Sequence, residues 1–331
     1  MKWLMLPLMA GKPWNGQTIH AEPLGGSESA VAYLARALAK KGENVTVVTH
    51  GTGCVVDDVT YINNTAGSTV GQIPWDVVLS SRWPQILTQP WKAKARVLWF
   101  HDLPADRELA VADLYVFISE YQKAQYRFRE GARSATIGDG VDESFLNTSV
   151  PERDKTRLIW TSNPDRGLPV AVKIMKEVRK RWPDLELHVF GRSSVYGWPD
   201  ANERPFRYHD SFMKECGVIL HDPLPRSLLR NELAKSWAFF YPTTWPETFC
   251  MAALEAQACG TPVIASPYGA LPETVKGGVL TYDFLNAISQ LRNARRWEKL
   301  SVQGMEFATT QTWDLVADAW IKEVNNAITK S

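Results

Sequence analysis

Residues 243–272 read TTWPETFCMAALEAQACGTPVIASPYGALP, and the interpretation of the whole chain starts from this stretch. The order of residue types predicts a loop, a helix, a turn, a buried strand and a second loop. We expect the helix over residues 248–258, because Gly260 ends it and Pro262 begins the next strand. A helix followed closely by a buried strand is typical of an α/β domain.

Two carboxylates, Glu247 and Glu255, lie eight positions apart in this stretch. Eight residues of helix rise about 12 Å, so the two side chains cannot serve the same atom. In one interpretation they serve opposite ends of an extended ligand, with Glu247 near a phosphate or reacting sugar and Glu255 accepting hydrogen bonds from a ribose diol. In the other, Glu255 lies on a solvated stripe with Gln257, and Glu247 is only a charge at the helix start.

Length and composition favour a two-domain globular protein. The chain has 331 residues and a formal net charge of +1, so no strong field selects nucleic acid or an anionic membrane as a partner. Its four cysteines form no CxxC pair and no histidine cluster accompanies them, so we expect no disulfide framework, no zinc site and a reducing, cytoplasmic setting. Residues 1–10 read as a buried strand rather than a signal peptide, and no run is long enough to span a membrane.

In the first half of the chain, short apolar runs alternate with helical segments. Ser27 is the expected N-cap of the first long helix, and Gly42 is its stop signal. Val31, Leu34 and Leu38 share one face of that helix. Residues 51–74 give no clear signal. Strands are expected at 4–6, 45–48, 76–79, 97–100, 114–118 and 135–137, and a further helix at 121–131.

The second half repeats this alternation, which predicts two doubly wound domains with parallel sheets. A polar segment at 147–155 marks the boundary. We therefore divide the chain into an N-terminal domain at 1–145, a second domain at 146–312 and a terminal helix at 313–331. Strands are expected at 157–161, 185–190, 218–220 and 237–241 and from 262 onward, with helices after 167 and at 226–234, 283–292 and 296–307.

In doubly wound sheets, ligands bind beyond the carboxyl ends of the strands. A ligand in a cleft between the two domains is therefore expected. The residues that follow the strands and carry unusual chemistry are His101, Ser119, Arg166, Arg192, His221 and Glu247.

Five of the candidate residues each have a functional and a structural interpretation. Gly25 and Gly26 precede a helix, where backbone N–H groups and the helix dipole suit a phosphate, but such a pair is also ordinary turn geometry. Arg166 can grip a diphosphate or be a surface residue in a turn, and the same holds for Arg192. His101 can contact a sugar hydroxyl or simply pack at a strand end.

The 247–273 block, with Glu247 and Glu255 followed by AQACGTPVIAS and GALPE, resembles the retaining GT-B glycosyltransferases of family 4. Weaker matches occur in the same order along nearly the whole chain. They are GGSE at 25–28, HD at 101–102, SE at 119–120, DGVD at 139–142, DRG at 165–167 and PDLELHVFG at 183–191. The resemblance implies two Rossmann-like domains and transfer of a sugar from a nucleoside diphosphate, with retention at the anomeric carbon.

The resemblance also implies a role for each matched residue. Gly25 and Gly26 would approach the donor diphosphate, and Arg166 would stand where the family has a phosphate-binding lysine. Glu247 and His101 would lie at the donor sugar as catalytic residues, and Glu255 would hold the ribose. The backbone at Thr248 and Phe249 would line the sugar and phosphate. No metal and no cofactor would be needed, and the donor would be a UDP-, GDP- or ADP-sugar.

The sequence departs from the family pattern at one important point. Many relatives carry a second cation shortly before the lysine that Arg166 replaces, whereas residues 160–162 are Trp, Thr and Ser here. Arg192 is a candidate replacement. The acceptor, a glycan, lipid-linked or small molecule, does not follow from the resemblance. Residues 123–133 mix aromatic and basic side chains, which suits a solvated helix face better than a membrane contact. A nucleotide-sugar epimerase and a catalytically silent binding protein stay open as alternatives.

Overall fold

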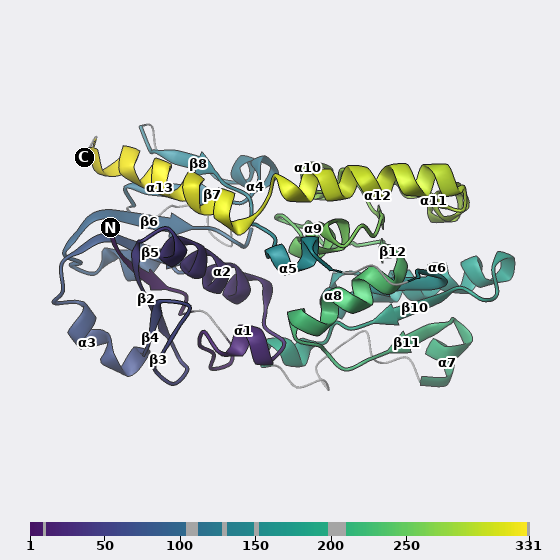
Figure 1. Cartoon of the computed structure of the whole chain (residues 1–331), viewed down its shortest axis with the longest axis horizontal. Coiled ribbons are helices and arrows are strands. Elements are labelled where there is room, and N and C mark those ends of the chain that lie inside the picture. Colours follow the sequence, from purple (N-terminus) through teal and green to yellow (C-terminus); the bar gives the residue numbers. More distant parts are fainter. Residues whose placement is uncertain (9–10, 104–111, 128–130, 149–151, 198–209, 330–331) are drawn as a thin grey trace. The chain divides into compact units, whose positions relative to one another are not determined.

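The computed structural model describes residues 1–8, 11–103, 112–127, 131–148, 152–197 and 210–329. The chain forms two compact units, one of Met1–Gly140 with Thr312–Ser331 and the other of Val141–Gln311 (Figure 1). The terminal helix therefore belongs to the first unit. The boundaries expected at 145/146 and 312/313 lie five residues and one residue beyond those of the two units.

The first unit contains an eight-stranded sheet in the order β3-β4-β2-β1-β5-β6-β7-β8. All neighbours pair in parallel except β3, which is antiparallel to β4. The six expected strands are confirmed, while the β3–β4 hairpin falls in the region that gave no signal. The strands are β1 (Lys2–Leu6), β2 (Asn44–Thr49), β3 (Cys54–Val56), β4 (Val59–Asn63), β5 (Trp75–Ser81), β6 (Ala93–Trp99), β7 (Leu114–Phe117) and β8 (Ser134–Thr136).

Two long helices pack in this unit, α2 (Gly26–Lys40) and α13 (Trp313–Thr329), and they contact each other. Trp320 of α13 packs its ring edge-on to Trp99 at the end of β6, with 5.0 Å between ring centroids. Gly42 adopts the left-handed conformation, with φ of 85°, and its N–H bonds to Ala39. The stop signal expected at Gly42 is therefore confirmed.

A core cluster on one face of the sheet includes Leu4, Leu6, Val78 and Leu98. Leu4 and Leu6 are two positions apart on β1, so their side chains point to the same face. Besides the strands, only short elements contribute side chains to this cluster among the described residues, namely α3 (Gly67–Val70), the 3₁₀ turn η2 (Pro84–Thr88) and the loop segments around them and after α4 (Glu120–Ala124). The helix expected at 121–131 is thus shorter than predicted, and residues 128–130 lie outside the described part. Tyr126 packs against Phe100, with 4.4 Å between ring centroids, so its ring serves the core rather than a membrane.

The second unit contains a six-stranded, fully parallel sheet in the order β11-β10-β9-β12-β13-β14. The central strand β12 is buried at all six positions, as its continuous apolar sequence predicts. The strands are β9 (Asp154–Trp160), β10 (Glu186–Val189), β11 (Val218–Leu220), β12 (Ser236–Tyr241), β13 (Val263–Ala265) and β14 (Gly278–Leu280).

Helices connect these strands (Figure 1). None of the helices among the described residues is long and apolar enough to cross a bilayer. The main helices are α6 (Leu168–Arg181), α8 (Arg226–Lys235), α9 (Met251–Ala258), α11 (Phe284–Leu291) and α12 (Ala294–Thr309), and the shorter ones are α5 (Glu143–Leu146), α7 (Asp210–Glu215) and α10 (Leu271–Thr274).

Candidate functional site

Helix α9 begins at Met251, three residues later than the sequence predicts. Cys250, its N-cap, adopts a left-handed conformation with φ of 78°, which is uncommon for a residue with a side chain. Phe249 is buried, and its carbonyl accepts a hydrogen bond from the Thr274 hydroxyl. Residues 248–250 therefore form a fixed, non-helical turn, so the rise of about 12 Å, which assumed a continuous helix from Glu247 to Glu255, does not apply.

Glu247 is a buried carboxylate, with 2% of its surface exposed. Arg166 Nη1 donates to both carboxylate oxygens at 3.0 Å, and the Tyr241 hydroxyl donates to Oε1. Burial raises the pKa of Tyr241 well above its usual value, and the Glu247 charge adds to this effect. The phenol therefore stays protonated as a donor. The alternative of Glu247 as only a charge at the helix start is wrong, because α9 begins four residues later and the carboxylate is buried.

Arg166 ends a 3₁₀ turn, η3 (Pro164–Arg166), directly before α6. Its carbonyl accepts hydrogen bonds from Thr243 Oγ1 at 2.6 Å and from Thr244 N at 3.2 Å. Gly167, with φ of 128°, makes this approach possible, since a Cβ there would lie 3.0 Å from the Pro242 carbonyl oxygen. Arg166 is thus tied to the loop after β12 through its backbone and to Glu247 through its guanidinium. It is not a free surface residue in a turn.

The backbone of Glu247 is held from the other side by the loop after β13. Ala270 N donates to the Glu247 carbonyl at 2.7 Å. Gly269 has φ of 64°, and a Cβ there would lie 2.4 Å from the Glu247 N and O atoms. The glycine of the GALPE segment is therefore required both by its conformation and by its closeness to Glu247.

Glu255 lies on α9 and is also buried, with 4% of its surface exposed. Arg226, the first residue of α8, forms an ion pair with it. Gln257 is buried too, and its side chain bonds to the backbone of Ala253 and Thr274. The solvated-stripe interpretation of Glu255 is therefore wrong. The sequence analysis missed Arg226, although an arginine directly after Pro225 at a helix start is the signal that marks it.

Arg192, the candidate replacement cation, donates from Nε to the His221 carbonyl at 3.3 Å. The His221 ring is stacked between Phe190, at 4.4 Å between centroids, and His188, at 5.0 Å. His188 Nδ1 lies 2.9 Å from His221 Nε2. This group follows the carboxyl ends of β10 and β11, as expected for His221 and Arg192. Residues 198–209, which follow this segment, lie outside the described part.

In the first unit, Gly25 is the N-cap of α2 and Gly26 is its first residue. The expectation that Ser27 is the N-cap is therefore wrong. Ser27 lies within the helix, where its hydroxyl donates to Glu28 Oε2 at 3.1 Å. A Cβ at Gly26 would meet no atom within 4 Å, so internal packing does not require this glycine. The helix start at Gly26 is open for a group from outside the unit.

His101 follows β6 and is 9% exposed, with its ring centroid 4.3 Å from that of Trp99. Burial, and then the charge of Arg82, lowers the pKa of His101 to about 3, so the ring is neutral at physiological pH. Arg82 directly follows β5, at a left-handed φ of 70°. Its Nε donates to Asp102 Oδ2 at 2.6 Å, and its Nη1 donates to the Ser27 hydroxyl at 3.1 Å.

Arg82 was missed by the sequence analysis, although its place after a strand is the same signal that selected His101. Among the residues that the structure describes, no group of three or more histidine, cysteine or acidic side chains is arranged to hold a metal ion. The predicted residues thus fall into two groups. Arg166 and Glu247 contact each other in the second unit, where Glu255 pairs instead with Arg226. In the first unit, Arg82 bonds to Ser27 and Asp102, the residues that follow Gly26 and His101.

Known protein sequences resemble parts of this chain. Residues 158–301 match the family model described as glycosyl transferases group 1. A curated relative, D-inositol 3-phosphate glycosyltransferase from Thermobifida fusca, is 25% identical over 302 residues, which are 78% of this chain and 68% of the relative. Other relatives of the same name are 30–36% identical, but those matches span only 21–48% of their own length.

Solved structures share the fold along essentially the whole chain. Sucrose-phosphate synthase from Thermosynechococcus elongatus aligns with a TM-score of 0.76 at 17% identity, covering 100% of both chains. Anabaena HepE in complex with UDP-glucose aligns with a TM-score of 0.73 at 14% identity, covering 98% of this chain and 100% of that one. These likenesses confirm the predicted architecture of two Rossmann-like domains with parallel sheets.

Proposed function

We propose, on the premise that the chain is a group 1 glycosyltransferase of the GT-B fold, that it moves a sugar from a nucleoside diphosphate to an acceptor hydroxyl. The observation that carries the proposal is the buried Arg166–Glu247–Tyr241 group at the carboxyl end of β12. Three elements fix this group, yet the Arg166 side chain keeps 33% of its surface exposed. A buried carboxylate paired with a half-exposed guanidinium suits a reaction centre next to an anionic leaving group.

The proposed chemistry is transfer with retention. The bond between the anomeric carbon and the diphosphate oxygen breaks, and the acceptor oxygen bonds to that carbon from the same face. The acceptor proton passes to the departing diphosphate oxygen. Arg166 stabilises the charge that develops on the diphosphate, and Glu247 stabilises the positive charge that develops on the sugar ring. Thr248 and Phe249 would present backbone groups to the sugar and phosphate.

The nucleoside would bind at Glu255. A buried carboxylate paired with Arg226 can accept hydrogen bonds from both ribose hydroxyls. Gly25 and Gly26 would admit the diphosphate, because no side chain occupies the start of α2, and neutral His101 would donate or accept a hydrogen bond at the donor sugar. We also propose that Arg166 and helix dipoles replace a metal ion, and that the protein works in the cytoplasm, where its four free thiols stay reduced.

Isothermal titration with UDP-, GDP- and ADP-sugars, each with and without EDTA, tests the donor proposal. Saturable binding of one donor that EDTA leaves unchanged is expected, and absence of binding by all three overturns the proposal. UDP-glucose is the first choice, because HepE is a structural neighbour that binds it. NMR of the product then reports the anomeric configuration. An inverted product contradicts retention, and an altered nucleotide sugar formed without acceptor indicates an epimerase.

A further inference from the structure

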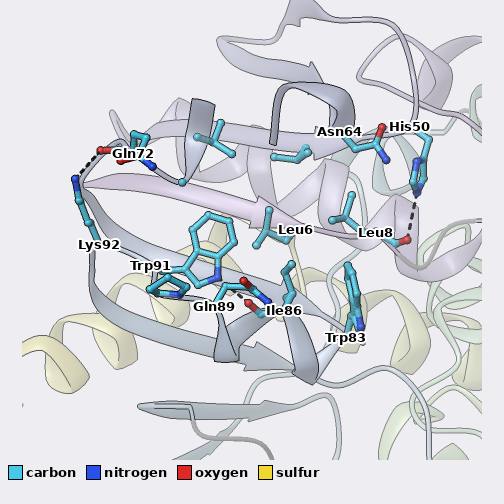
Figure 2. Close-up of a pocket in the computed structure, with 14 residues that line it drawn as sticks. Leu6, Leu8, His50, Asn64, Gln72, Trp83, Ile86, Gln89, Trp91 and Lys92 are labelled. Carbon is cyan, nitrogen blue, oxygen red and sulfur yellow. Dashed lines mark hydrogen bonds between the residues drawn. The ribbon is translucent and has the colours of Figure 1, made fainter. Parts of the chain in front are cut away.

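The first unit contains a hollow of about 790 Å³ that the proposed donor chemistry does not use (Figure 2). Fourteen residues line it, from the ends of β1 and β2, from η2 and from the loops beside α3 and β6. Its volume falls within the range of small-molecule pockets, which are about 300–1,000 Å³. The hollow therefore has room for a ligand of drug size.

The hollow exists because one crossover is unusually short. Parallel strands are normally joined by a crossover that contains an α-helix. Between β5 and β6 the described chain has only the five-residue turn η2, and next to it α3 has only four residues. Neither element is long enough to cover the sheet, so part of this face remains open beside Leu6 and Val48.

The floor of the hollow is hydrocarbon. Leu6 and Val48 come from neighbouring strands, and Val70 comes from α3. Trp91 lies beside Leu6 in Figure 2, and its indole N–H is already bonded to the Ile86 carbonyl at 2.7 Å, so only its ring is available. Sugar hydroxyls placed on such a floor would lose their hydrogen bonds to water without replacement. The floor therefore favours an apolar group over a saccharide.

Apart from Gln89, which lies between Trp91 and Ile86 in Figure 2, the labelled polar side chains lie at the two ends of the hollow. His50 and Asn64 lie at one end, and Gln72 and Lys92 lie at the other, as Figure 2 shows. Of these, His50 and Asn64 directly follow β2 and β4, which puts this end at the carboxyl edge of the sheet, the edge that also carries His101. None of the lining residues is a carboxylate, so a cationic ligand gains no partner.

We propose that this hollow binds the hydrocarbon portion of an amphipathic acceptor, with the hydroxyl-bearing end of the acceptor at the edge near His50 and Asn64. The inference rests on the proposed function, because it assigns the acceptor of the same transfer. Trp83 forms the wall at that edge. An acceptor with an alkyl or ring aglycone would bury its apolar part against the half-buried side chains of Leu8, Ile86 and Trp91, while its sugar or alcohol head stays in water.

The test compares octyl β-D-glucoside, below its micelle concentration, with methyl β-D-glucoside by isothermal titration. The wild type is expected to bind the octyl compound at least about tenfold more tightly, since each buried methylene contributes about 0.8 kcal/mol. Ile86→Trp, which fills the hollow, is expected to weaken octyl binding about tenfold, and Trp83→Ala, which removes a wall, to weaken it as well. Gln85→Trp is the control, because Gln85 is exposed in the same turn and does not line the hollow.

The proposal is overturned if the wild type binds the octyl and methyl compounds with equal affinity, or if the wild type and Ile86→Trp bind the octyl compound equally well. Displacement of the octyl compound by UDP also overturns it. Equal affinities for the two glucosides would indicate a saccharide site instead. A separate UDP titration distinguishes the two proposals. UDP binding without octyl binding defeats only the acceptor pocket, and octyl binding without binding of any nucleotide sugar defeats only the proposed transfer.

Discussion

Arg166 and Glu247 are 81 positions apart in the sequence, yet Arg166 Nη1 lies 3.0 Å from both carboxylate oxygens of Glu247. The two ends of this pair differ in their surroundings, since 33% of the Arg166 side chain is exposed but only 2% of the Glu247 side chain. The Glu247 carboxylate is therefore held in the interior by Arg166 and Tyr241, while part of the Arg166 guanidinium stays accessible to an anionic ligand. This asymmetry is what a site for an anionic leaving group needs.

Glu247→Gln keeps the size of the side chain and removes its charge. We expect kcat to fall on the order of 10²-fold, the scale seen when one electrostatic contact to a transition state is lost. Nucleotide binding should change less than turnover, because Glu247 is assigned to the reacting sugar. Steady-state kinetics and titration with UDP measure the two effects. Glu298→Gln on the exposed face of α12 is the control, and an equal loss in binding and in turnover would contradict the assignment.

Tyr241→Phe tests the support of Glu247 from β12. The ring of Tyr241 packs 4.7 Å from that of Trp160, and phenylalanine preserves this contact. Only the hydroxyl donor to a buried carboxylate is lost, so the free energy of unfolding should fall by about 1–3 kcal/mol. Urea denaturation measures this change. A stability equal to that of the wild type would mean that the phenol contributes nothing to holding Glu247.

Most strands were predictable because their sequences are apolar on both faces. Phe239 and Phe240 on β12 are fully buried on opposite faces, and such runs leave little choice but a central parallel strand. The hairpin β3–β4 was missed because its strands have only three and five residues, between polar loops at the edge of the sheet. The edge strand β14 was also missed because it has only three residues.

The start of α9 could not be predicted, because tertiary contacts override local preference there. Residues 248–250 have no helix breaker, but the Thr274 hydroxyl binds the Phe249 carbonyl and Gly269 packs on Glu247. The pairing of site residues is equally non-local. Nothing near Glu255 in the sequence identifies Arg226 as its partner. Arg166 and Glu247 were each selected because they follow a strand, but their contact requires the fold.

The Arg226–Glu255 pair provides a double-mutant cycle. Arg226→Met leaves the Glu255 charge buried without its partner, and we expect a loss of about 3–5 kcal/mol in the free energy of unfolding. Replacing both residues by methionine should recover most of this loss, because the uncompensated charge is gone. Denaturation of the four proteins measures the coupling. Full additivity of the two single changes would show that the pair is not coupled.

The same cycle separates stability from ligand binding. If Glu255 holds the ribose, the double methionine variant should fold but bind a nucleoside diphosphate at least about tenfold more weakly than the wild type, since two charge-assisted hydrogen bonds are lost. Titration at a temperature at which all four proteins are folded makes this comparison. Unchanged nucleotide affinity in a folded double variant would assign Glu255 to structure alone.

Arg82 combines a strained backbone with contacts to Asp102 and Ser27. Both Arg82→Ala and Arg82→Gly remove these contacts, but only glycine relieves the left-handed φ of 70°. We expect the glycine variant to be about 1 kcal/mol more stable than the alanine variant, because the strain of a non-glycine residue at such an angle is of this order. Chemical denaturation of both variants measures the difference. An alanine variant as stable as the glycine variant would show that the conformation costs nothing here.

His101 makes stability depend on pH. Its folded pKa is lowered from 6.5 to about 3, so between these values the unfolded chain binds a proton that the folded chain does not. Stability should therefore fall as pH drops from about 6.5 towards 3, by up to about 1.4 kcal/mol per pH unit from this residue. His188 in the second unit has a pKa lowered to about 4, so its protonation should also reduce stability as the pH drops.

His101→Gln should reduce this slope, because glutamine does not titrate. Urea denaturation at pH 4.5, 5.5 and 6.5 gives the slope for the variant and the wild type. The sign follows from burial, which disfavours the charged ring in the folded protein only. A slope in His101→Gln as steep as in the wild type would mean that His101 is solvated enough to protonate in the folded state. Its role as a neutral partner of a donor sugar would then fail with it.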